Sequence, residues 1–173
     1  VDQELLIHVI DEHAANSDWD SIIEILEPWL ENDCRDHWLR LELAMVYQRK
    51  FDFDNALIHA RLALRIAPDC AMTQWTVALI HLARCEFKEA SEMADELINR
   101  SSSEIMHGTC GTGSDCDIHT AKAETLANDS KMLLAICYHE MGYEKISRHF
   151  RQLYKRRVAK GIGTMFPQAD VEF

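Results

Sequence analysis

Two histidines and two cysteines lie close together in the spacing His107-x2-Cys110-x5-Cys116-x2-His119. Two thiolates and two imidazoles are a donor set that holds zinc tetrahedrally, and the x2 spacings suit a metal loop. The five residues between the cysteines are not a common zinc-knuckle spacing. A Cys110–Cys116 disulfide is an alternative, and reduced cysteines in a glycine-rich loop are the leading interpretation. The segment is therefore a candidate zinc site or redox-responsive loop.

The same side chains could pair a cysteine nucleophile with a histidine base, but no orienting group or oxyanion site is evident. The run GTCGTGSD lacks the Lys-Ser/Thr that follows a phosphate-binding loop, and no strand precedes it. His139-Glu140 lacks the second histidine of a metalloprotease helix. We therefore expect no catalytic residues and no enzyme.

Helices must position this loop, because the rest of the chain has near-continuous 3.6-residue periodicity, six glycines and three prolines. The most regular stretch is 36–70, where large and small residues alternate on two helical faces joined by a turn at 50–53. Such alternation lets two antiparallel helices approach closely. The residues that carry this pattern are Leu43, Ala44, Tyr47, Ala56, Ala60, Ala63 and Pro68.

The pattern recurs 34 residues later, from Ala44 to Ala78 and from Ala56 to Ala90, and it recurs more weakly 34 residues earlier. A fourth unit contains Leu134, Ala135, Tyr138, Gly142 and Ile146, and its turn looks one residue short. These units resemble the tetratricopeptide repeat, a 34-residue helix–turn–helix. The loop at 110–113, followed by Asn128-Asp129, is similar to loops of bacterial members and implies no activity.

The resemblance implies an all-α, right-handed solenoid of about four antiparallel helix pairs in one domain, residues 1–173. The expected repeats are 3–36, 37–70, 71–100 and 128–158, with a loop insertion at 101–117 and a tail at 159–173. Residues 118–141 form either one long helix or two shorter ones.

In tetratricopeptide proteins the first helix of each pair lines a concave groove. The resemblance assigns to this groove Trp38, Leu41, Met45, Arg49, Met72, Trp75, Leu79, Leu82, Met132, Ile136 and His139. Aromatic residues and methionines suit an amphipathic helix or an extended peptide. The alternative is that the chain's own tail or a second copy covers this face. Leu41 and Met45 replace the Lys and Asn with which chaperone-binding members hold a C-terminal carboxylate, so we do not expect such recognition.

Charge is unevenly distributed within a net charge of −11. The first 36 residues contain eleven acidic residues and one basic residue, Arg35, whereas residues 145–160 contain seven basic residues and no acidic one. The simplest interpretation of this asymmetry is two solvated faces, and the alternatives are head-to-tail association of copies or an acidic partner for the last helix. The acidic flanks of the groove favour a basic or amphipathic protein partner. Nucleic acid is not an expected partner. No apolar run is long enough for a membrane span, and the scattered cysteines suggest a reducing, cytoplasmic compartment. The sequence thus predicts a non-catalytic adaptor.

Overall fold

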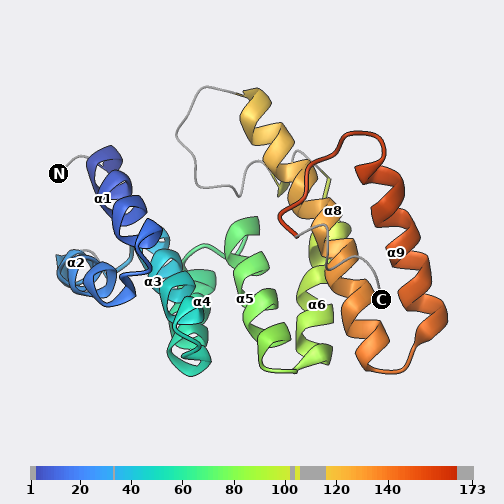
Figure 1. Cartoon of the computed structure of the whole chain (residues 1–173), viewed down its shortest axis with the longest axis horizontal. Helices are drawn as coiled ribbons and strands as arrows, with labels where there is room; N and C mark the ends of the chain where they lie inside the picture. The colour runs from blue at the N-terminus through green and yellow to red at the C-terminus, as the bar shows by residue number, and fades with distance from the viewer. Residues whose placement is uncertain (1–2, 33, 102–103, 106–115, 167–173) are drawn as a thin grey trace. The chain divides into compact units, whose positions relative to one another are not determined.

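The structure is a computed structural model that describes residues 3–32, 34–101, 104–105 and 116–166. Within these residues the regular elements are helices (Figure 1), which confirms the all-α prediction. The helices are α1 (Gln3–Ala15), α2 (Trp19–Asn32), α3 (His37–Arg49), α4 (Phe53–Ile66), α5 (Ala71–Ala83), α6 (Phe87–Ile98), α8 (Cys116–Glu140) and α9 (Glu144–Val158). They form four antiparallel pairs in the part of the chain described, as the fold prediction requires.

The chain divides into two compact units. Unit 1 is Val1–Ile66 and contains α1 to α4, and unit 2 is Ala67–Phe173 and contains α5 to α9. Within each unit, every helix packs on the next one along the chain, which is how an α-solenoid is built. The single domain predicted for residues 1–173 stays a prediction.

Each unit has its own apolar core. In unit 1, buried side chains of α1, α2 and α3 meet, among them Leu6, Ile22 and Leu43. In unit 2, Ala78, Ala90 and other small residues lie where α5, α6 and α8 approach one another. Burying one leucine-sized side chain is worth about 2 kcal/mol, so packing of the helix pairs is the main source of stability.

The turn inside each pair has a repeated backbone geometry. Ser17, Phe51 and Cys85 lie 34 residues apart and have positive φ angles of 57°, 60° and 59°. The N–H of the residue that follows each of them donates to a carbonyl five residues back, at 2.9 to 3.0 Å. This bond ends the first helix of the pair and satisfies one of its last carbonyls. The 34-residue period is therefore present in the backbone itself.

The expectation of a shorter fourth turn is wrong. Tyr138 and Gly142 are four positions apart, as are Tyr47 and Phe51, and Gly142 has a φ of 83°. The position equivalent to Ala56 is therefore Ser147, which is fully buried, whereas Ile146 is 43% exposed. The Ser147 hydroxyl donates to the Ala135 carbonyl at 2.7 Å. A small polar residue can replace alanine here because a neighbouring carbonyl accepts its hydroxyl hydrogen.

Residues 118–141, for which the sequence left two alternatives, lie almost entirely in one helix, the 25-residue α8. Much of the predicted loop insertion, residues 102–103 and 106–115, lies outside the described residues.

Candidate functional site

Unit 1 contains an open cavity of about 500 Å³ lined by α1, the start of α2 and α3. Met45 and Arg49, both predicted groove residues, belong to its α3 wall. We call it the α1–α3 cavity; its lining residues are Ile10, Asp11, Ala14, Ser17, Trp19, Ile22, Glu42, Met45, Val46 and Arg49. Apolar side chains are accompanied by two carboxylates and one guanidinium, so the cavity suits an apolar group with charged neighbours.

The other two predicted residues of α3 do not line this cavity. Trp38 is half-buried and packs against the core of unit 1. Leu41 is buried, with 4% of its surface exposed. The structure thus places two of the four predicted residues of α3 at an open surface and two in packed positions.

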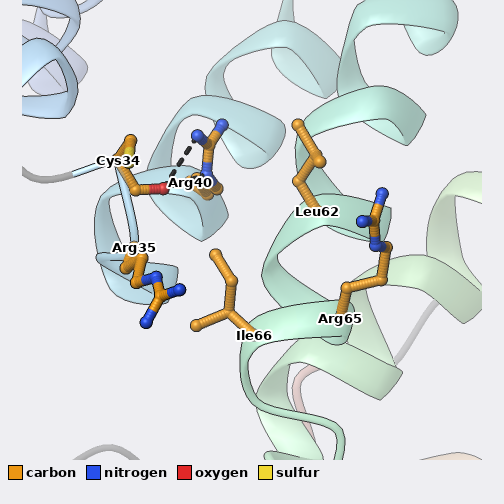
Figure 2. Close-up of a pocket in the computed structure, with 6 residues that line it drawn as sticks. All are labelled: Cys34, Arg35, Arg40, Leu62, Arg65 and Ile66. Carbon is orange, nitrogen blue, oxygen red and sulfur yellow. Dashed lines mark hydrogen bonds between the residues drawn. The ribbon is translucent and has the colours of Figure 1, made fainter.

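A second cavity of unit 1, of about 430 Å³, is lined by Cys34, Arg35, Arg40, Leu62, Arg65 and Ile66 (Figure 2). The Arg40 guanidinium donates to the Cys34 carbonyl from Nε at 3.1 Å and Nη2 at 2.9 Å, which holds the connection before α3. The guanidinium groups of Arg35 and Arg65 lie on opposite sides of the cavity in Figure 2. No sequence motif predicts this basic cavity, because its arginines come from separate segments of the chain.

In unit 2, part of the predicted groove is covered by the chain itself. Trp75 and Met132 are 4% and 1% exposed. Phe166 packs edge-on against Trp75, with ring centroids 5.8 Å apart and planes at 84°. It also packs against the cluster of Met132, Ala135 and Tyr154. The structure therefore brings Trp75 of α5 and Met132 of α8 together beneath one aromatic ring.

Residues 161–166, which we call the return segment, pass from the end of α9 back over α8 (Figure 1). Asp129 of α8 is fully buried and accepts two hydrogen bonds from this segment. The Thr164 hydroxyl donates to Oδ1 at 2.7 Å, and the Met165 N–H donates to Oδ2 at 2.7 Å. Asp129 is thus paired through both carboxylate oxygens.

Thr164 Oγ1 joins three parts of unit 2. Besides donating to Asp129, this oxygen accepts the Tyr154 hydroxyl of α9 at 2.7 Å and the Phe166 N–H at 3.0 Å. Burial raises the pKa of the Asp129 carboxyl, while the Met165 N–H and the Thr164 hydroxyl oppose that rise. A buried carboxylate without such donors is costly, so Asp129 favours a state in which the return segment stays in place.

The remaining predicted residues of unit 2 lie elsewhere on α5 and α8. Met72, Leu79 and Leu82 are partly buried and pack against the unit 2 core. Ile136 packs against the cluster that contains Met132. His139 lies ten residues beyond Asp129, about 15 Å along the helix, and its Nδ1 is 2.6 Å from Glu144 Oε1. His139 therefore belongs to the turn between α8 and α9.

The predicted zinc site stays a prediction. His107 and Cys110 lie outside the described residues, as do the side chains of Cys116 and His119. Among the side chains that the structure describes, no group of three or more His, Cys, Asp or Glu residues could hold a metal ion. Cys137 is fully buried, and burial raises the pKa of its thiol to about 12, as expected of a packing residue.

Comparison with known proteins found no matching family model and no matching curated protein. Solved structures of similar fold include a crystal structure of MamA, with 11% identity over 88% of this chain and 96% of that chain and a TM-score of 0.47. A crystal structure of MamA protein gives 11% identity, coverages of 95% and 97%, and a TM-score of 0.48. A structure of Naa15/Naa10 bound to HypK-THB gives 15% identity over 96% of this chain and 26% of that chain, with a TM-score of 0.47.

No described helix combines the length and apolarity needed to cross a bilayer.

Proposed function

We propose that this chain is a non-catalytic, tetratricopeptide-like interaction module that binds a peptide or helix of a partner protein on the first helices of its pairs. The observation that supports this function most directly is the seating of the return segment on α5 and α8. Backbone and side-chain donors of this non-helical segment reach Asp129, and an aromatic ring rests on Trp75. Hydrogen bonds to a peptide backbone and a buried aromatic anchor are contacts by which proteins hold peptides.

The α1–α3 cavity is the proposed open site for that partner. Its apolar wall includes Ile10, Ala14 and Met45, and its two carboxylates outnumber its one guanidinium, that of Arg49. The acidic excess of the first 36 residues extends this negative potential. The occupant that fits is an amphipathic segment with an apolar side chain flanked by lysine or arginine, because charge complementarity then favours its approach.

Selection of random peptides on the intact chain, followed by calorimetry with a synthetic consensus peptide, tests this function. We expect an enriched apolar residue with basic neighbours. Met45→Lys should weaken binding of that peptide at least tenfold, because it places a cation on the apolar wall, where the apolar side chain of the peptide binds. Ile58→Ala, at a side chain of α4 that is 55% exposed, is the matched control and should leave affinity unchanged.

Circular dichroism of both variants separates lost binding from lost folding. A selection that enriches no motif would refute the proposed function. A consensus peptide whose affinity is the same for Met45→Lys and the unchanged chain would refute the α1–α3 cavity as its site.

A further inference from the structure

We propose that unit 2 carries a second peptide site, closed in this structure by the return segment, and that its partner supplies the sequence Gly-Ser/Thr-x-aromatic. The proposal rests on the proposed function in one respect, since it takes the first helices of the pairs as peptide-binding faces. The return segment reads Gly-Ile-Gly-Thr-Met-Phe, and its last four residues display the chemistry that this site recognises.

A hydroxyl is required at the position of Thr164. Its oxygen donates to Asp129 Oδ1 and accepts from the Tyr154 hydroxyl, both at 2.7 Å. A serine or threonine hydroxyl supplies one donor and two acceptor lone pairs in this small volume. A carboxylate would meet the Asp129 carboxylate as a like charge, and an apolar side chain would leave Asp129 short of a partner.

The next position contributes only its backbone. The Met165 N–H donates to Asp129 Oδ2 at 2.7 Å, while the Met165 side chain is 48% exposed. Any residue with an N–H therefore fits, and proline does not, because it lacks that donor.

The flanking positions set size limits. Phe166 fills the space between Trp75 and the cluster around Met132, so an aromatic residue is expected there. A Cβ at Gly163 would lie 3.0 Å from Thr125 Oγ1, which is tighter than ordinary contact. Glycine is therefore favoured immediately before the hydroxyl residue. Together these positions define the partner as a peptide of stated chemistry.

The internal segment competes with any external peptide for these contacts. The apparent affinity of a ligand falls by the fraction of molecules in which its site is open. Weakening the internal contacts should therefore strengthen binding of an external copy of the same sequence.

The test titrates a synthetic peptide, Gly-Ile-Gly-Thr-Met-Phe, into the full ¹⁵N-labelled chain and follows the amide signals of α8 by NMR. The T164V/F166A variant keeps the shape of residue 164. It removes the hydrogen bonds of the Thr164 hydroxyl, and it also removes the ring that packs on Trp75. We expect this variant to saturate at a peptide concentration at least tenfold lower than the unchanged chain. A peptide with valine in place of threonine should lose this binding.

Ile146→Ala, at a residue of α9 that is 43% exposed, is the control and should behave as the unchanged chain. Circular dichroism checks folding, and T164V alone provides the same comparison if the double variant does not fold. Equal saturation in the double variant and the unchanged chain, or equal binding of the threonine and valine peptides, would overturn the proposal.

The proposals for the two sites can be refuted independently. Met45→Lys should not alter binding of this peptide, because Met45 lies in unit 1. If Met45→Lys leaves the affinity of the unit 1 peptide unchanged while the unit 2 peptide binds as expected, only the α1–α3 cavity is refuted.

Discussion

His81 Nδ1 lies 2.6 Å from Glu86 Oε2 across the turn between α5 and α6. His13 and Asp18 have the same relationship two repeat lengths earlier, at 2.9 Å across the turn between α1 and α2. In both pairs, a histidine near the end of the first helix meets an acidic residue near the start of the second. Negative charge also suits the N-terminal end of a helix, so the two effects reinforce each other.

Glu86→Gln should lower the thermal midpoint at neutral pH by about 3 °C. The Arg84 guanidinium, and next the His81 imidazole, lower the pKa of the Glu86 carboxyl. A lowered pKa means that the folded state binds the proton less tightly than the unfolded state. The stabilisation is therefore present above the ordinary pKa of glutamate, about 4.3, and is lost as the pH falls through the lowered value.

Thermal unfolding as a function of pH measures this effect. Glu89→Gln, an exposed acid in the first turn of α6, makes the same change of charge and should leave the midpoint almost unchanged. An equal loss in both variants would attribute the effect to the helix dipole and not to the turn.

Cys85→Gly should stabilise the chain, and Gly142→Ala should destabilise it, each by about 1 kcal/mol. Both residues occupy the left-handed region, at φ 59° and 83°, where a side chain is strained. A Cβ at Gly142 meets nothing within 4 Å, so its cost is conformational alone. Urea unfolding measures both variants, and Cys85→Ala, which retains a Cβ, should show no gain. A stabilisation of Cys85→Ala equal to that of Cys85→Gly would show that the thiol, and not φ, is responsible.

Ser147→Ala should cost about 1 kcal/mol, because the hydrogen bond to the Ala135 carbonyl is lost. Ser147→Val should cost about 2 kcal/mol, because it also adds a methyl group where α8 and α9 approach closely. The free energy of unfolding should be highest with serine at position 147, lower with alanine and lowest with valine. Gln152→Ala, at an exposed position of α9, is the control and should leave it unchanged. A valine variant as stable as the unchanged chain would show that the helices have room to spare.

Lys131→Met should raise the free energy of unfolding at neutral pH by about 1 kcal/mol. This is less than the full pKa shift would give, because Lys131 is only partly buried and solvent screens its charge. Burial, and to a lesser degree Arg157, lower the pKa of Lys131 from 10.5 to about 8. Between these values the unfolded state binds more protons, so stability of the unchanged chain rises with pH.

The methionine variant should lack that rise, and urea unfolding from pH 7 to pH 10 compares the two slopes. Lys122→Met, an exposed lysine of the same helix, should keep the slope. Parallel slopes in Lys131→Met and the unchanged chain would contradict the prediction.

The helix pairs could be predicted from the sequence because their evidence is local. Ala56 and Ala90 recur at a fixed period and are fully buried where two helices meet. The apolar pattern does not identify Ser147 as the equivalent of these alanines, because hydrophobicity alone does not reveal that a carbonyl accepts its hydroxyl hydrogen. The repeated left-handed turns are occupied by serine, phenylalanine, cysteine and glycine, so their regularity is visible only in the backbone.

The candidate site could be predicted only in part. The sequence predicts Trp75 and Met132 on a binding face, with coverage of that face by the chain's own tail as an alternative. Which residues would cover it depends on the contact between Asp129 and Thr164, which lie 35 positions apart. No periodic pattern encodes such a contact, because it is set by the path of the chain after α9.

The short connection from α9 to Thr164 sets the local concentration of the return segment at its own site. A segment tethered this closely is presented to Asp129 and Trp75 at an effective concentration of the order of millimolar. A free peptide that offers only the same contacts must reach a comparable concentration before it occupies half of the molecules. A partner that acts at micromolar levels must therefore gain additional contacts beyond those of the return segment, on the remaining surface of unit 2.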